Sequence, residues 1–390
     1  MKEQKMNLNF TDKENKFRQE ARSWLEEHVP KQQLASGDTK QGFADHLIWE
    51  KKLFQGGWAA VSWPKAYGGR EASLMEWLIF EEEYYRAGAP NRVVQNGIFL
   101  LAPTLFEFGT EEQKSRLLKN IASAETLWAQ AWSEPNAGSD LAGIKSKAIR
   151  TDGGWLLSGQ KTWCTRAMFC DGVFGLFRTD PEAPRHRGMT YFMVDLKAKG
   201  ITLRGVDRLD GDEGFAEVFF DEVFVPDHDV IGEVNEGWKV AMATTSSERG
   251  LSLRSPGRFM ATATQLIHLY KQSHHQKPEL RDQVIEAWME AEAYRLYTFQ
   301  TVNKMDKGIP IGPESSLNKI FWSEMDIKTH ETALGILEQR AELAEDAGDN
   351  ETAGSWMKGY QFALAGPIYA GTNEIQKNVV AERVLGLPRK

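Results

Sequence analysis

The sequence predicts an α+β protein that is mostly α-helical. We expect an N-terminal helical domain over residues 1–126, a middle antiparallel β-barrel or sandwich domain over 127–232, and a C-terminal helical bundle over 233–390. Two changes of hydrophobic period carry this prediction, because apolar residues recur at helical spacing in the outer segments and in short strand-like runs between them. A chain of 390 residues is also long enough for two or three domains.

The N-terminal segment begins with a helix-start signal. The tetrapeptide at 11–14, Thr-Asp-Lys-Glu, is a capping-box pattern, and apolar residues recur at helical spacing through 17–25. A second helix is expected over Leu47–Phe54 and a third from about Ser73 to Gly88. The acidic run Glu81–Glu83 in the third helix is interpreted as a solvated face.

The middle segment contains short apolar runs separated by turn residues. An Asp-Gly-Gly turn precedes a predicted strand at 155–159, and further strands are expected at Tyr191–Val194, Val218–Phe220 and Val223–Val225. Several short strands of this kind are typical of a small barrel or sandwich. The pattern after Gly237 predicts long helices, with breaks near Gln272–Pro278, Gly308–Pro313 and Ala347–Gly354.

Composition excludes several classes of function. The net charge is −8, from 47 basic and 55 acidic residues, which argues against a general nucleic-acid surface. No run approaches the ~20 apolar residues of a membrane span. Two cysteines rule out a disulfide framework and make a metal site a poor expectation, so we expect no metal and a reducing compartment, the cytoplasm.

The segment Ala131–Asp140 is the most informative motif. It leads from an apolar stretch into a tight turn that Pro135 and Gly138 punctuate. A loop of this kind lets backbone N–H groups approach a flat polar ring closely. The segment Thr110–Lys114 precedes it, and Gly159–Thr165 follows it.

In that order and at that spacing, these segments resemble the middle of the acyl-CoA dehydrogenase family, flavoenzymes that desaturate acyl-CoA thioesters. The resemblance covers nearly the whole chain and implies the three-domain fold expected above. The other matching segments are Pro64–Gly69, Phe108–Lys114, Trp163–Thr165, Val223–Pro226, Glu248–Arg249 and Tyr369–Gln376.

The resemblance implies an FAD site. Ser133 stands where the family has Thr, and its hydroxyl and the neighbouring backbone are expected at the pyrimidine edge of the flavin. Thr165 is expected near the reactive flavin nitrogen, with Trp163 flanking the ring system. The backbone near Trp132 is implied at the same pyrimidine edge, and Gly138 and Ser139 at the boundary between flavin and ligand. Thr372 and Glu374 are implied near the ribityl or phosphate groups.

The catalytic base departs from the commonest family pattern. Many members carry Glu directly before the Gly-Thr pair of the C-terminal loop, whereas this chain has Ala370. A minority place the base on a helix near the start of the C-terminal domain, which implies Glu248. Tyr369 is a poor substitute, because a phenol with a pKa near ~10 stays protonated at neutral pH. Ser139, Arg249 and the backbone of Ala370 are the implied substrate contacts, the last as part of an oxyanion hole.

A second departure concerns cofactor binding between subunits. The R-x-x-F-G and Q-x-x-G-G stretches of common members are not evident at Gln272–Pro278 and Glu338–Asp349. This resembles a bacterial branch in which some members pair two different subunits and act on bulky acyl chains, including steroid side chains. The implied partners are an acyl-CoA substrate, an electron-transfer flavoprotein and a second subunit, in a homodimer, homotetramer or heterotetramer.

Three functions stay open at this point. The first is an FAD-dependent acyl-CoA dehydrogenase, which would belong to fatty-acid β-oxidation. The second is a flavin monooxygenase or oxidase of the same fold, for which Glu248 would be incidental. The third is a non-catalytic subunit that completes the flavin site of another chain. Oxygen consumption would favour the second, and failure to retain flavin in isolation the third.

Overall fold

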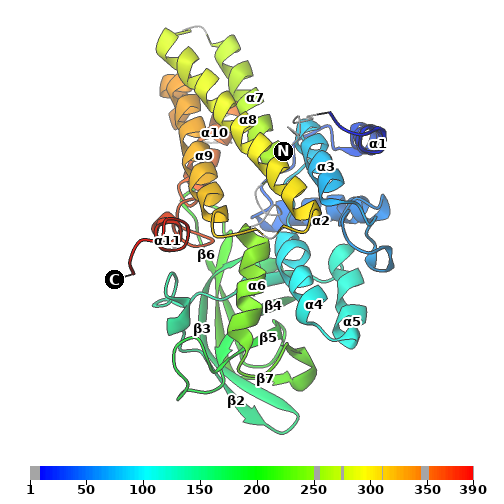
Figure 1. The fold of residues 1–390 in the computed structure, drawn as a ribbon, viewed down its shortest axis with the longest axis vertical. Coiled ribbons are helices and arrows are strands. Elements are labelled where there is room, and N and C mark those ends of the chain that lie inside the picture. The colour runs from blue at the N-terminus through cyan, green and yellow to red at the C-terminus, as the bar shows by residue number, and fades with distance from the viewer. Residues whose placement is uncertain (1–8, 250–254, 274–275, 310, 344–350, 390) are drawn as a thin grey trace, which may run out of the picture.

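The computed structural model describes residues 9–249, 255–273, 276–309, 311–343 and 351–389, without the side chains of 246–249 and 351–353. Figure 1 shows a sheet domain at one end of the molecule, with the N-terminal helices beside it and the long C-terminal helices extending away from it. Helix α6, Gly237–Arg249, lies against the sheet and contacts strand β5 and helix α4. The predicted order of helical, strand-rich and helical segments is therefore confirmed.

The N-terminal helices begin at side chains that cap them. Thr11 and Glu14 form the predicted capping box of α1, and Ser73 with Glu76 forms another at α3. Each box satisfies two backbone N–H groups that a helix leaves unpaired. The helices are α1 Asp12–His28, α2 Lys40–Gln55, α3 Leu74–Arg86, α4 Ala102–Phe108 and α5 Glu111–Ala122, with short 3₁₀ and π turns at Lys65–Tyr67 and Asn96–Leu101.

The interpretation of Glu81–Glu83 as a solvated face is wrong. Glu81 is 6% exposed and Glu83 only 1%. The Glu83 carboxylate accepts hydrogen bonds from Arg18 and Arg22 of α1 and from Arg86, at 2.7 to 2.9 Å. An acidic run is buried here because basic residues far away in the sequence cover it, which the local pattern does not reveal.

The middle segment forms one eight-stranded sheet in the described residues, in the order β6-β7-β3-β2-β4-β5-β8, with β1 paired to β4. Most pairs are antiparallel as predicted, but β1 and β2 each pair with β4 in parallel. The two runs predicted at 218–220 and 223–225 belong to one strand, β7. The strands are β1 Trp128–Ala131, β2 Lys147–Thr151, β3 Gly154–Thr165, β4 Gly172–Arg178, β5 Met189–Asp195, β6 Ile201–Val206, β7 Phe215–Pro226 and β8 Val230–Ile231.

The C-terminal segment is a bundle of long helices. The predicted breaks at Gln272–Pro278 and Gly308–Pro313 are confirmed, because helices end and begin there; the third overlaps residues outside those described. The helices after α6 are α7 Pro256–Gln272, α8 Pro278–Asp306, α9 Ser315–Leu337, α10 Glu351–Ala363 and α11 Asn373–Val379, followed by a π turn at Val380–Val384.

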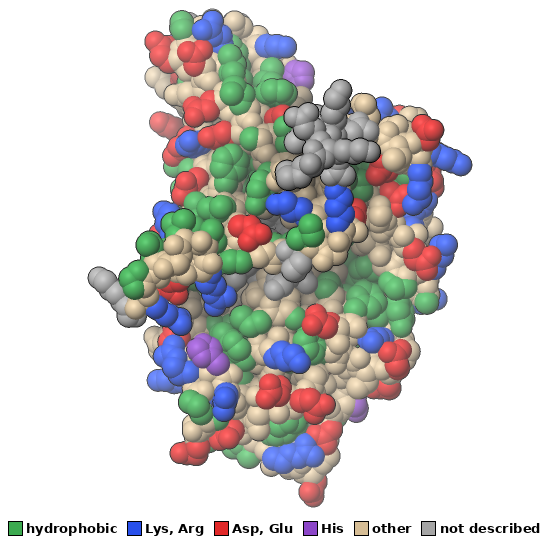
Figure 2. Space-filling model, in the orientation of Figure 1, with side chains coloured by type: hydrophobic (Ala, Val, Ile, Leu, Met, Phe, Trp, Pro, Cys, Tyr) green, Lys and Arg blue, Asp and Glu red, His purple; other side chains and the backbone are tan. Residues whose placement is uncertain are grey.

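The surface mixes both signs of charge. On the face shown in Figure 2, acidic and basic side chains are interspersed and do not gather into one basic patch. Within the described ranges, no helix has the length and apolar character needed to cross a membrane.

Candidate active site

A buried ion pair holds the motif turn that follows β1. Lys161 of β3 has no exposed side-chain surface, and its Nζ donates to Glu134 Oε1 at 2.9 Å and to the Trp132 carbonyl at 3.2 Å. Glu134 also accepts from the backbone N–H groups of Lys145 and Ser146, at 2.7 and 2.9 Å. Burial acts to raise the pKa of Glu134, but Lys161 and these donors outweigh it and lower that pKa. The turn is therefore fixed to the sheet by charge-assisted hydrogen bonds.

A β-bulge turns Trp163 outward. Strand β3 has register shifts against β7 between Leu157 and Gly159 and between Lys161 and Cys164. Lys161 and Cys164 both point into the interior, whereas Trp163 between them has φ +59° and a side chain that is 60% exposed. Its ring meets that of Phe215 edge-on, with centroids 5.8 Å apart. The bulge thus presents one face of a large aromatic ring that packing leaves uncovered.

The structure brings four of the predicted cofactor residues together. The Thr162 N–H donates to the Ser133 carbonyl at 2.9 Å, which joins the turn carrying Trp132 to the strand end carrying Trp163 and Thr165. Ser133 and Thr165 are half-buried, and the Ser133 hydroxyl makes no hydrogen bond to any described residue. A flat polar ring fits such a place, since an uncovered indole lies near a hydroxyl that no described residue bonds.

Gly138 and Ser139 lie at the exposed edge of the same turn. A Cβ atom built on Gly138 would have no neighbour within 4 Å, so the space beside this residue is open. Glu134 and Ala137 exchange two backbone hydrogen bonds of 3.0 Å and thereby close the turn just before these residues.

The C-terminal loop before α11 has a left-handed backbone. Ala370 has φ +55° and Gly371 φ +80°, and Gln376 Nε2 donates to both of their carbonyls at 3.3 Å. The buried Lys319 of α9 donates to the Gly366 carbonyl at 2.7 Å and to Asn373 Oδ1 at 3.0 Å. A left-handed non-glycine residue persists only where surrounding contacts fix it, as they do here.

Thr372 and Glu374 differ in their environments. The Thr372 hydroxyl oxygen caps α11 by accepting from the Ile375 N–H at 3.2 Å, while Glu374 is exposed on the same helix. Across the described residues, no hydrogen bond or ion pair joins the loop at 370–374 to Ser133 or Trp163. The structure therefore supports two separate halves of the predicted site.

The predicted base lies in the last turn of α6. Glu248 and Arg249 belong to this helix, but their side chains are outside the described part of the structure. Glu248 follows Thr244 by one helical turn, so the two positions share a face. The Thr244 hydroxyl lies 2.7 Å from that of Thr104 in α4, which fixes this face of α6 against the N-terminal domain.

A cavity of about 790 Å³ adjoins this helix. It lies between the N-terminal and C-terminal helices, with Pro103 of α4, Ala243 of α6 and Ser316 of α9 among its walls. This size falls within the roughly 300–1,000 Å³ of small-molecule pockets.

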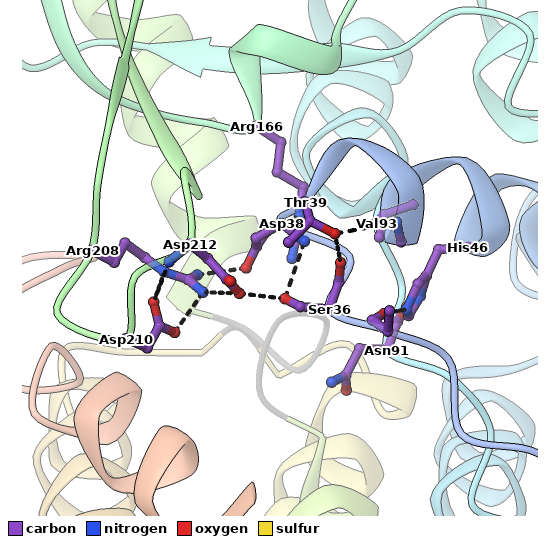
Figure 3. A network of polar contacts seen from close by, with 12 residues as sticks. Ser36, Asp38, Thr39, His46, Asn91, Val93, Arg166, Arg208, Asp210 and Asp212 are labelled. Carbon is purple, nitrogen blue, oxygen red and sulfur yellow. Dashed lines mark hydrogen bonds and ion pairs between the residues drawn. The ribbon is translucent and has the colours of Figure 1, made fainter. Parts of the chain in front are cut away.

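The sequence did not indicate the polar network behind the end of β3. Arg166, next to Thr165, donates to Asp38 Oδ1 at 2.6 Å, and Arg208 donates to Asp38 Oδ2 at 2.5 Å (Figure 3). Asp212 accepts from Ser36 at 2.5 Å and pairs with Lys358 of α10 at 2.8 Å. These contacts tie all three segments of the chain together at the strand end that carries Trp163.

Several positioning residues were also missed. Lys161 and Lys319 hold the two halves of the site, yet an isolated lysine is typical of a solvated surface. The sequence did contain an indication for Lys161. Side chains two residues apart in a strand lie on the same face, so Lys161 belongs to the face that buries Trp155 and Leu157. Asp210 and Asp212 also accept from Arg208 Nη2, at 2.7 and 3.3 Å.

Comparison with known protein families gives matches along the whole chain. The models of the acyl-CoA dehydrogenase N-terminal, middle and C-terminal domains match residues 11–125, 129–223 and 235–385. Acyl-CoA dehydrogenase IpdE1 of Mycolicibacterium smegmatis is 34% identical over 96% of this chain and 98% of its own. The 3-(aryl)acrylate reductase of Clostridium sporogenes is 28% identical over 96% of this chain and 99% of its own.

Solved structures share the same fold. The Tcur3481-Tcur3483 steroid ACAD has a TM-score of 0.89 and 27% identity, covering 99% of this chain and 100% of its own. A chain of the ChsE4-ChsE5 complex from Mycobacterium tuberculosis has a TM-score of 0.86, 26% identity and the same coverage. PigA, solved with FAD and proline, has a TM-score of 0.81 at 20% identity, over 98% of this chain and 100% of its own. From the three domain matches and the 34% identity over nearly its full length, this chain belongs to the acyl-CoA dehydrogenase family of oxidoreductases.

Proposed function

We propose that this protein catalyses the FAD-dependent α,β-dehydrogenation of an acyl-CoA thioester to the trans-2-enoyl-CoA, and that an electron-transfer flavoprotein accepts the electrons. The observation that carries the proposal is the exposed indole of Trp163, which a bulge turns outward on the strand that is hydrogen-bonded to the turn at Ser133. An aromatic face of this size is costly to leave in water, and a flavin ring would cover it.

FAD suits the residues that line this place. When bound, it supplies an acceptor for the hydrogen and electron pair that leave the β carbon. The Ser133 hydroxyl and the backbone near Trp132 would hold the pyrimidine edge of the flavin, and Thr165 would lie near its reactive ring atoms. Gly138, Ser139, Thr372 and Glu374 complete the cofactor contacts of the proposal.

Glu248 removes the α proton. The position of α6 supports this role, because the helix borders the cavity at Ala243 and is fixed against α4 through Thr244. A carboxylate enclosed by apolar surface has a raised pKa, which brings a general base closer to working pH. The backbone N–H of Ala370 donates to the thioester carbonyl. This role needs no side chain, so it does not depend on the glutamate that many family members have at this position. Ser139 and Arg249 contact the CoA ester.

An absorbance spectrum with an anaerobic titration tests the proposal. A yellow protein that an acyl-CoA thioester bleaches without oxygen is a dehydrogenase. A yellow protein that no member of a broad thioester panel bleaches, and that consumes oxygen when its flavin is reduced by other means, contradicts the proposal and favours the monooxygenase.

A heteromeric assembly is the second candidate. Large apolar side chains stay exposed on the C-terminal helices and tail, including Met289, Ile368, Leu385 and Leu387, at 53 to 66%. Apolar surface of this kind is typical of subunit interfaces. The names of two similar structures each join two proteins. A colourless protein that gains FAD when it is mixed with a homologous subunit would support a shared site.

The compartment proposed for the protein is the cytoplasm, because its two free cysteines suit a reducing environment.

A further inference from the structure

The wall of the cavity carries four ionisable side chains that the reaction proposed above does not use, and two of them are buried. Glu81 of α3 and Arg92 both line it, and they are only 6% and 4% exposed. Apolar residues such as Trp63, Trp77 and Phe80 line the same cavity. Charged side chains are rarely buried at this depth without a partner.

Arg92 is only partly satisfied by protein groups. Its Nε donates to Glu50 Oε2 at 2.7 Å and its Nη2 to the Ala59 carbonyl at 2.9 Å. Its remaining nitrogen, Nη1, donates to no described residue. A guanidinium has five N–H donors and these bonds use two of them, so Arg92 has donor capacity to spare at the cavity wall.

Glu81 is not the partner of Arg92. No ion pair within 4 Å joins them in the described residues, although the charge of Arg92 acts on Glu81 and the Ser255 hydroxyl lies beside the carboxyl. Burial is the largest influence on this carboxyl and raises its pKa to about 7, so a large fraction is protonated at neutral pH and can donate a hydrogen bond. Close packing keeps Glu81 in place, since a Cβ on Gly257 of α7 would come within 2.7 Å of its carbonyl.

From this geometry we propose that the cavity binds an acyl group that carries an uncharged oxygen, a ketone or hydroxyl, away from the thioester, and that Glu81 and Arg92 bind this oxygen. The inference rests on the proposed acyl-CoA dehydrogenase activity and names the class of its substrate. Both side chains line the same cavity, and the charge of Arg92 acts on Glu81, so a single acceptor bound in the cavity would be bonded by both donors.

Charge balance favours an uncharged oxygen over a carboxylate. Arg92 and Glu50 already neutralise each other in their buried pair. Arg383 also lines the cavity, but it is exposed. A carboxylate on the acyl group would add a negative charge next to Glu81 with no buried cation of the cavity wall left to neutralise it, which is costly. An acyl chain without a distal oxygen would also bind less favourably, because it would leave the hydrogen-bond donors of Glu81 and Arg92 without an acceptor.

Matched acyl-CoA thioesters test the substrate class. At each chain length, the panel contains an acyl chain with a terminal methyl, one with a distal ketone, one with a distal hydroxyl and one with a terminal carboxylate. We expect the ketone or the hydroxyl to reduce the flavin with a kcat/KM about tenfold higher than the methyl partner, as one hydrogen bond of typical strength allows. Equal values, or a preference for the carboxylate, would overturn the inference while leaving the dehydrogenase activity intact.

Variants assign the preference to Glu81. Glu81→Leu should abolish the preference for the oxygenated chain, whereas Glu81→Gln, which retains an N–H donor, should keep part of it. Glu107→Leu is the matched control, because Glu107 lines the same cavity but is exposed. A folded Glu81→Leu protein that keeps the full preference would refute the role of Glu81.

A binding measurement separates this inference from the proposed function. If no thioester reduces the flavin, calorimetric titration of the same matched pairs still compares their affinities. An affinity ratio of about tenfold in favour of the oxygenated chain supports the recognition site, and equal affinities overturn it.

Discussion

Lys161 Nζ lies 2.9 Å from Glu134 Oε1 with both side chains withdrawn from solvent, and this pair joins the motif turn to the strand end that bears Trp163. The ammonium group also reaches the Trp132 carbonyl, so one side chain organises both segments. The cofactor surface proposed for the middle domain thus depends on a lysine that itself has no exposed surface.

Lys161→Met should therefore destabilise the protein and empty the flavin site together. Removing one partner of a buried ion pair leaves the other uncompensated, and we expect a loss of about 3 kcal/mol in unfolding free energy. The flavin-to-protein absorbance ratio should fall in parallel. Urea unfolding and the absorbance spectrum measure the two effects.

Lys197→Met is the matched control, since Lys197 pairs with Asp171 at the same 2.9 Å but is 76% exposed. It should change stability by less than about 1 kcal/mol and leave the flavin content unchanged. Equal losses for both variants would show that burial of the pair is not the cause.

The elements of this fold were predictable because their signals are local. The capping box at Thr11 and the turn before Trp155 each lie within a few residues of the structure they specify. The outward orientation of Trp163 could not be predicted in this way, because a register shift between β3 and β7 determines it. Strict alternation would place Trp163 on the same inward face as Lys161, two residues before it. The burial of Glu83 depends on Arg18 and Arg22, more than sixty residues earlier in the chain.

The candidate site was predictable in residue type more than in arrangement. Family resemblance located Ser133, Trp163 and Thr165, which the structure brings together. It gave no indication of Lys319 or Asp38, whose contacts join segments far apart in sequence. Such contacts follow from how helices and sheet pack against each other, and no short motif encodes them.

Glu248→Gln should retain the flavin and lose its reduction by substrate. A correctly placed general base contributes roughly 10²–10⁴-fold, so the rate of anaerobic bleaching should fall by that factor while the absorbance spectrum stays normal. Exchange of the substrate α proton with deuterated solvent should fall equally, because it needs the same base.

Glu236→Gln, at an exposed glutamate just before α6, is the control and should change neither rate. Normal bleaching by the Glu248→Gln variant would contradict the role of Glu248 and assign proton removal to another group.

Asp38→Asn should loosen the contact between the three segments. Asp38 accepts from both Arg166 and Arg208, and its side chain is 10% exposed. Loss of its charge weakens two short charge-assisted hydrogen bonds, so we expect about 2 kcal/mol of destabilisation and faster flavin release. Thermal unfolding and flavin fluorescence follow these changes.

Asp140→Asn offers a direct comparison, since Asp140 pairs with Arg185 at 2.5 Å but both side chains are more than half exposed. Its effect on stability should stay within about 0.5 kcal/mol. If the two variants behave alike, the network at Asp38 does not hold the segments together.

Glu81 and Glu83 should give opposite contributions to stability as pH changes, although only one residue separates them. Three arginines offset the burial of Glu83 and lower its pKa from 4.5 to about 2, so its contribution is present above pH 4.5 and is lost as pH falls towards 2. The shift corresponds to on the order of 3 kcal/mol. Burial raises the pKa of Glu81 from 4.5 to about 7, with Arg92 and Ser255 as the opposing neighbours. The folded state then binds the extra proton, and stability falls as pH rises from 4.5 to 7.

Glu81→Gln should remove this fall. The difference in unfolding free energy between this variant and the unmodified protein should therefore shift in favour of the variant as pH rises from 4.5 to 7. Glu83→Gln should instead lose most at neutral pH and least near pH 2. Urea unfolding at a series of pH values distinguishes the two, and a parallel pH dependence for both variants would contradict the assignment.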